Sequence, residues 1–170
     1  MINFGKLNIT KGLQEWIALH EVMAPKMLAV GIQFRFAIAN PAEDTLFLLI
    51  EMNGDIEEML NVSNNPQAIE MREAAGVKVD TQEMISAIDS SVFWEKNVPN
   101  KSSKILGMID VVGEFNFENT TKYLNLSGSD KLIWSGYSSE KNKLYFLTEN
   151  KSEAKKDYGL MSEIKAVYFP

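Results

Sequence analysis

The sequence predicts an α+β fold with a mostly antiparallel sheet of about five to six strands, on which an N-terminal helix and a central helical segment pack. Segments that alternate like strands follow one another through short polar turns, as they do in antiparallel sheets. Helical periodicity is gathered near the N-terminus and in residues 54–97, so the regular alternation of a doubly wound fold is absent. We therefore expect residues 1–170 to form a single α+β domain.

The composition is that of a globular protein. The chain has 170 residues, of which 45% are hydrophobic, enough for a sizeable core. It has no cysteine, which excludes disulfides, zinc–cysteine sites and a thiol nucleophile. It shows no secretory signal and no apolar run that approaches the about 20 residues of a membrane-spanning helix. These features predict a cytoplasmic protein without a membrane segment, and no internal repeat is detectable.

The first helix is expected to begin at Thr10, whose side chain suits an N-cap. Its apolar face repeats at helical spacing through Leu13, Trp16, Ile17 and His20. Pro25 should end or kink this helix near Met23, because proline removes a backbone donor and clashes with the preceding turn.

A hairpin is expected next. Residues 30–39 and 45–52 both alternate like strands, and the polar turn between them contains Asn and Pro. In the first of these strands, a period of two places Phe34, Phe36 and Ile38 on one face.

Three helices are then expected within residues 54–97. The first is short and starts near Asp55. The second has Pro66 in its first turn and Gly76 as its C-cap. The third, residues 80–97, has the most regular apolar stripe of the three.

The rest of the chain returns to strand patterns. Strands are expected at residues 104–117, 131–137, 143–148 and 163–169, with a turn at residues 125–130. The second and third of these strands should form a hairpin, because only a short polar turn separates them.

Charge is unevenly spread along the chain. The net charge is −6, yet the segment from Glu43 to Asp89 holds eleven acidic and two basic residues, which leaves +3 for the rest. Direct binding of nucleic acid needs a positive surface, so we expect none. A negative surface suits a basic protein partner. The residues expected to contact that partner are the carboxylates of the helical segment: Asp55, Glu57, Glu58, Glu70 and Glu73.

Candidate catalytic residues are few. His20 is the only histidine and is followed by Glu21, so it could act as a general base. Asp110 and Glu114 share one face of the strand expected at residues 104–117. On a straight strand they lie ~13 Å apart, beyond the ~5–9.5 Å of the carboxylate pairs in glycoside hydrolysis. A solvated strand face is therefore the simpler interpretation of these two acids.

Motifs for other chemistry are absent from the sequence. A lone histidine cannot form an H-E-x-x-H zinc site, and no glycine-rich phosphate loop or EF-hand loop occurs. We therefore expect no metal and no cofactor.

Three classes of function fit these observations. The leading hypothesis is a small intracellular protein-binding module, of an inhibitor, immunity or phage-accessory type, that engages a basic partner through the acidic helical face. The alternative is an enzyme, a hydrolase or transferase, that uses His20 with nearby carboxylates. The third is a structural or assembly subunit in which strand edges at residues 30–39 or 163–169 pair between copies. No feature of the sequence predicts an oligomeric state.

Overall fold

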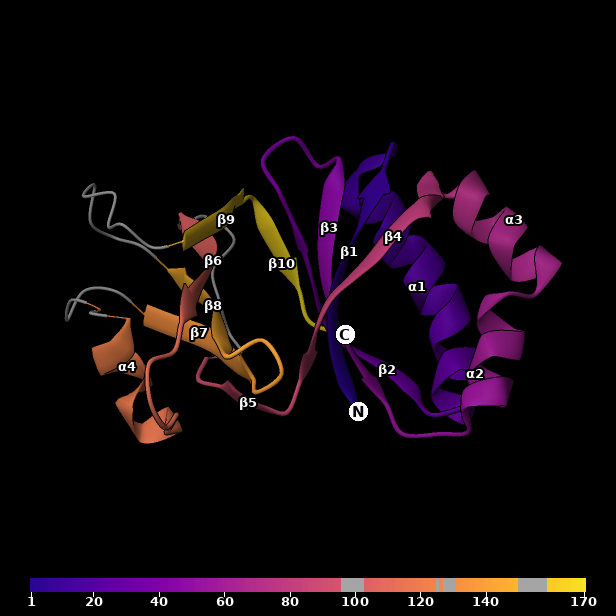
Figure 1. The fold of residues 1–170 in the computed structure, drawn as a ribbon. Coiled ribbons are helices and arrows are strands. Elements are labelled where there is room, and N and C mark those ends of the chain that lie inside the picture. Colours follow the sequence, from indigo (N-terminus) through magenta and orange to yellow (C-terminus); the bar gives the residue numbers. More distant parts are fainter. Residues whose placement is uncertain (96–102, 125, 127–130, 150–158) are drawn as a thin grey trace. The chain divides into compact units, whose positions relative to one another are not determined.

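A computed structural model describes the chain except for residues 96–102, 125, 127–130 and 150–158. The described residues form two compact units, which are unit 1 (residues 1–87 and 167–170) and unit 2 (residues 88–166). Each unit has one five-stranded antiparallel sheet (Figure 1). The predicted α+β class is confirmed, with the strands divided between two sheets. The assignment of residues 1–170 to one domain stays a prediction.

Unit 1 has the strand and helix order βαββααβ, with one further strand from the C-terminus. Its elements are β1 (Ile2–Ile9), α1 (Gly12–Ala29), β2 (Ile32–Ala39), β3 (Thr45–Met52), α2 (Ile56–Ser63), α3 (Pro66–Ala74), β4 (Val77–Ile88) and β10 (Ala166–Tyr168). The sheet has the order β10-β2-β3-β1-β4, so β1 and β3 are central and β4 returns to the edge beside β1. Apart from β10, this is the split βαβ arrangement of ferredoxin-like folds.

Unit 2 repeats the same strand order. Its elements are β5 (Ser90–Phe93), β6 (Lys104–Asp110), the 3-10 helix η1 (Phe117–Asn119), α4 (Thr120–Tyr123), β7 (Lys131–Ser138), β8 (Lys143–Glu149) and β9 (Gly159–Ile164). The sheet order is β5-β7-β8-β6-β9. The strands β6 to β9 therefore take the places of β1 to β4, and β5 takes the place of β10. The topology is repeated although the sequence shows no repeat.

The helices of unit 1 lie together on one face of its sheet (Figure 1). The local sequence explains where α2 and α3 begin. The Asp55 side chain accepts hydrogen bonds from the backbone N–H groups of Glu57 and Glu58, and the Asn65 side chain accepts one from Gln67. Pro66 follows at the first turn of α3, where its missing N–H costs nothing.

Helix α1 is confirmed, but its N-cap lies one residue after the predicted Thr10 and it does not end near Met23. The buried residues of α1 are Leu13, Trp16, His20 and Met23, close to the predicted stripe. The N-cap is Lys11, and the Thr10 hydroxyl instead donates to the carbonyl oxygen of Gly76 at 3.2 Å. The helix continues through Pro25 to Ala29.

The hairpin of β2 and β3 is confirmed, but the faces of β2 differ from the prediction. The pairing register shifts between Phe34, which pairs with Ile50, and Phe36, which pairs with Leu49. Arg35 is therefore the extra residue of a β-bulge. Because Ile50 and Leu49 point to opposite faces of β3, the bulge places Phe34 and Phe36 on opposite faces of the sheet.

The predicted helical segment of residues 54–97 is wrong beyond Ala74. Residues 80–88 and 90–93, most of the predicted third helix, instead belong to strands β4 and β5. Residues 96 and 97 of that predicted helix lie outside the described residues. The pairing of β4 with β1 at the edge of the sheet overrides the local helical periodicity. The Thr81 hydroxyl supports this pairing by accepting a hydrogen bond from the Asn8 N–H at 2.9 Å.

The later strands are partly as predicted. The hairpin of β7 and β8 is confirmed. The strand expected at residues 104–117 ends at Asp110, before Gly113 with its φ of +86°. The strand expected at residues 163–169 is divided between β9 and β10. The predicted turn at residues 125–130 lies, except for one residue, outside the described part of the chain.

None of the helices that the structure describes has the length and apolar character needed to cross a membrane.

Candidate functional site

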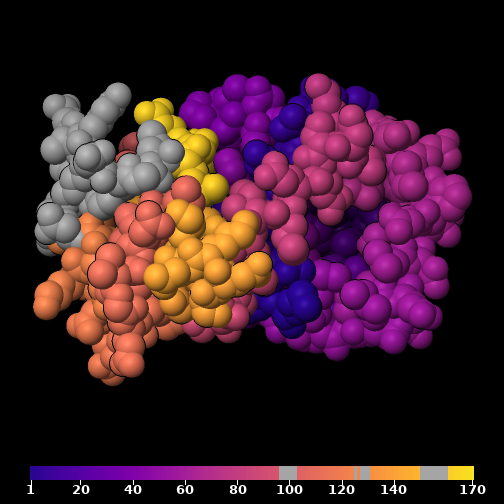
Figure 2. Space-filling view, viewed as in Figure 1, coloured from indigo at the N-terminus to yellow at the C-terminus, as the bar shows by residue number. Residues whose placement is uncertain are grey.

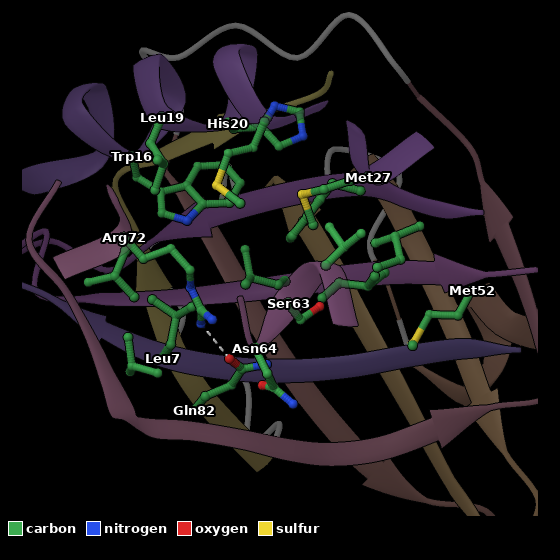
Figure 3. Close-up of a pocket in the computed structure, with 18 of the residues that line it drawn as sticks. Leu7, Trp16, Leu19, His20, Met27, Met52, Ser63, Asn64, Arg72 and Gln82 are labelled. Carbon is green, nitrogen blue, oxygen red and sulfur yellow. Dashed lines mark hydrogen bonds between the residues drawn. The ribbon is translucent and has the colours of Figure 1, made fainter. Parts of the chain in front are cut away.

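Unit 1 contains a cavity of about 550 Å³ between the sheet and its helices. Side chains from β1, β2, β3 and β4 form its sheet side, and side chains from α1, α2 and α3 form the other side (Figure 3). In the space-filling view, the surface of unit 1 is hollowed between β4 and the helices α2 and α3 (Figure 2). We call this cavity the unit 1 pocket.

The lining of the unit 1 pocket is mainly apolar. Aliphatic and methionine side chains contribute most of it, among them Leu7, Leu19, Met23, Met27, Ile32, Leu48, Ile50 and Met52. The bulge at Arg35 has a direct effect here, because it directs Phe34 to the same face as Ile50 and so into the pocket. Such a surface suits an apolar ligand.

His20 reaches the pocket from the buried face of α1. Its side chain is only 8% exposed and is surrounded by three aromatic rings. It stacks on Trp16, with ring centroids 5.3 Å apart, and meets the edges of Phe34 at 5.1 Å and Tyr168 at 5.7 Å. Tyr168 belongs to β10, so the C-terminal strand completes the surroundings of the imidazole.

The surroundings of His20 keep its imidazole neutral. Burial lowers the pKa of His20 below its ordinary value of 6.5, and the negative charge of Glu21 opposes this only in part. The buried Nδ1 atom has no hydrogen-bond partner within the described part of the chain. A neutral imidazole at the wall of a cavity can exchange a proton with a bound molecule that reaches one of its ring nitrogens.

Polar groups gather in a different part of the pocket. Arg72 of α3 donates a hydrogen bond from Nη2 to Oε1 of Gln82 on β4 at 2.6 Å. Asn64 lies beside them, and His20 lies apart from this group (Figure 3). Burial lowers the pKa of Arg72, but an arginine stays charged at neutral pH.

The carboxylates proposed to act with His20 are not in the pocket. Among the described residues that line it there is no Asp or Glu. Glu21 is exposed on α1. Asp110 and Glu114 belong to unit 2, whereas His20 belongs to unit 1. Asp110 forms an ion pair with Lys143 at 2.8 Å, and Glu114 is exposed beyond the end of β6.

The acidic residues from Glu43 to Asp89 lie on several kinds of element. Asp55, Glu57 and Glu58 are at the start of α2, and Glu70 and Glu73 are on α3. The others lie in the β2–β3 turn, on β3 and β4, and after β4, at Glu43, Asp44, Glu51, Asp80, Glu83 and Asp89. Several of these acids have partners within the protein: Asp44 accepts from the Asn40 side chain, Glu51 pairs with Arg35, Glu83 pairs with Lys6, and Asp89 accepts from the Ser139 N–H.

Of the two residues His20 and Arg72, which both line the pocket, the sequence analysis named only His20 as a candidate. One signal was present, because Arg72 is one of only two basic residues in the segment from Glu43 to Asp89. In the ranges that the structure describes, no group of three His, Asp or Glu side chains is placed to hold a metal ion.

Comparisons with known proteins give a similarity of structure only. No protein-family model matches the chain, and no curated protein matches its sequence significantly. A crystal structure from Fusobacterium nucleatum, described as a putative monooxygenase, is 13% identical, with 99% of this chain and 93% of that chain covered and a TM-score of 0.46. A second, described as a putative monooxygenase from Lactobacillus acidophilus, is 12% identical, with 99% and 95% covered and a TM-score of 0.43.

The prediction of an inhibitor- or immunity-type binding protein is wrong. Neither of the similar structures is described as such a protein. The acidic helical segment on which the prediction depended ends at Ala74, and the acids beyond it lie on or after strand β4.

Proposed function

We propose that unit 1 is the catalytic part of an enzyme that binds an apolar small molecule and removes a proton from it with His20. The observation that supports this function is the buried, neutral imidazole of His20 at an apolar cavity, with Nδ1 unpartnered within the described residues. A general base must be unprotonated to act, and it is most effective where its pKa lies near the working pH.

The size and lining of the unit 1 pocket indicate the class of substrate. Its volume of about 550 Å³ lies within the roughly 300–1,000 Å³ that is common for small-molecule sites. Trp16 and Phe34 offer aromatic surfaces beside the imidazole. Methionines line other parts of the wall and can adapt to the outline of a ligand. A substrate with an apolar, preferably aromatic, body fits these features.

The proposed step moves one proton and needs no co-reactant. A C–H or O–H bond of the substrate breaks, its electron pair stays on the substrate, and a new N–H bond forms on the imidazole of His20. The resulting imidazolium is disfavoured because its surroundings are apolar. It therefore returns the proton readily, either to another atom of the substrate or to water.

The ring opening of 5-nitrobenzisoxazole tests this function without knowledge of the natural substrate. A base removes the C–H proton of this flat, apolar probe, the ring N–O bond breaks, and a coloured cyanophenolate forms. We expect His20→Gln to lower the rate by about 100-fold, the usual contribution of a general base. Lys26→Gln changes an exposed residue of the same helix and is the matched control.

The pH profile gives the second readout. The rate should rise with pH through the pKa of His20 and then become constant. It should become constant at a lower pH than the rate with free imidazole does, because the pKa of His20 is lowered. A folded His20→Gln variant with the wild-type rate would exclude His20 as the base. Circular dichroism of both variants shows whether they are folded.

A further inference from the structure

Arg72 is a charged side chain without an anionic partner in the part of the protein that the structure describes. Its recorded hydrogen bond goes to the neutral amide of Gln82, and the ion pairs found among the described residues do not include it. Glu70 and Glu73, its acidic neighbours on α3, are both exposed. A guanidinium has five N–H donors, and the hydrogen bond to Gln82 uses one of them.

Arg72 lies at the wall of the pocket, where a ligand could supply the missing anionic partner. The side chain is half-buried and lines the pocket, so it has lost part of its hydration. Loss of hydration without a counter-charge is unfavourable, and a bound anion would offset it. Gln82 holds the guanidinium through a short hydrogen bond, which reduces the cost of ordering it when a ligand binds.

We propose that Arg72 binds the anionic group of the substrate, so that the unit 1 pocket takes apolar acids with a carboxylate or a similar planar or tetrahedral oxyanion. This inference rests on the pocket of the proposed function and adds the substrate class. The guanidinium fork matches two oxygens of one carboxylate, which a lysine could not do equally well.

The surroundings also indicate which way the substrate lies. Gln82 and Asn64, which lie beside Arg72, are exposed, whereas His20 is buried (Figure 3). The charged group of the ligand therefore stays at the solvent-facing end of the pocket. Its apolar body extends inward along Leu48 and Phe34 and brings a C–H or O–H bond towards His20.

A matched pair of fluorescent probes tests the inference. The two probes are 8-anilinonaphthalene-1-sulfonate and N-phenyl-1-naphthylamine, which share the same rings and differ by the sulfonate. We expect Arg72→Gln to weaken binding of the sulfonate by at least about tenfold, since hydrogen bonds to charged groups are strong ones. Binding of the neutral amine should change less than about twofold, because apolar contacts supply it. Arg72→Lys should give an intermediate loss for the sulfonate.

Lys26→Gln is the control, since it also removes one positive charge and Lys26 is exposed on α1 and does not line the pocket. It should leave both affinities as in the wild type. An equal loss of both probes in Arg72→Gln, or no loss of the sulfonate, would overturn the inference, as would a wild type that binds neither probe. A selective loss of the sulfonate together with full proton-transfer activity in His20→Gln would confirm the anion site and refute the proposed function.

Discussion

The imidazole of His20 lies flat against the indole of Trp16, with ring centroids 5.3 Å apart and an angle of 19° between the planes. Both side chains come from successive turns of α1, and the edges of Phe34 and Tyr168 complete the enclosure. The same contact lowers the pKa of the imidazole by excluding water and holds the ring at the wall of the pocket.

The enclosure by Trp16 should control the pKa of His20. Trp16→Ala opens space for water beside the imidazole, so the pKa of His20 should rise towards 6.5. The lost packing should also lower the free energy of unfolding by about 3–5 kcal/mol. Trp16→Phe keeps an aromatic face and should change the pKa much less. NMR titration measures the pKa directly, because the chain has one histidine; equal pKa values in the three proteins would contradict the prediction.

The pH dependence of stability should carry a contribution from His20. Its pKa is lowered in the folded state, so between that value and 6.5 the unfolded chain binds more protons than the folded chain. This contribution is fully present above pH 6.5 and is lost as pH falls through the folded-state pKa. Urea unfolding from pH 7.5 to 5 should show the wild type losing more stability than His20→Gln. Parallel curves for the two proteins would show that burial does not penalise the charged imidazole.

The bulge in β2 should tolerate loss of its extra residue. Deletion of Arg35 leaves Phe34 opposite Ile50 and Phe36 opposite Leu49, so both aromatic residues keep their faces. We expect this variant to fold with a loss of about 1–2 kcal/mol, within the usual range for a single change. Ala37 lies in regular pairing, so its deletion moves the side chains on one side of the deletion to the opposite face of the sheet. This variant should not fold. Circular dichroism and urea unfolding compare the two, and equal damage would contradict the assignment of Arg35 as the bulge residue.

Gly54 should be far more sensitive to alanine than Gly113. A Cβ atom at Gly54 would lie 2.0 Å from the carbonyl oxygen of Val30, so the backbone between α1 and β2 must move. Gly113 has a φ of +86° but no heavy atom within 4 Å of its added Cβ. We therefore expect Gly113→Ala to cost about 1–2 kcal/mol of backbone strain. Gly54→Ala should lower the free energy of unfolding by several times as much, and thermal unfolding of the two variants checks the order.

Local patterns were enough for elements whose partners are close in sequence. The i, i+3, i+4 spacing predicted the buried face of α1, and two adjacent alternating segments predicted the hairpins β2–β3 and β7–β8. His20 was a candidate base because it is the only histidine of the chain. Even here the details depended on packing, since the bulge at Arg35 reversed the expected face of Phe36.

Elements that depend on distant partners were not predictable in this way. Residues 80–93 carry a helical pattern, yet most of them extend because β4 satisfies its backbone groups beside β1, far away in the sequence. The two units likewise share one strand order because their strands pair in the same way, and this similarity is not visible as a repeat in the amino-acid sequence.

The amino-acid sequence alone determined the α+β class, the first helix, the hairpins and the scarcity of catalytic groups, because each depends on periodicity or residue type. Only the tertiary structure decided that His20 and Arg72 share one cavity, and that the acids from Glu43 to Asp89 do not form a single helical segment. The physical reason is that a pocket is the space left between packed elements, and its lining depends on register and bulges that local propensity does not encode.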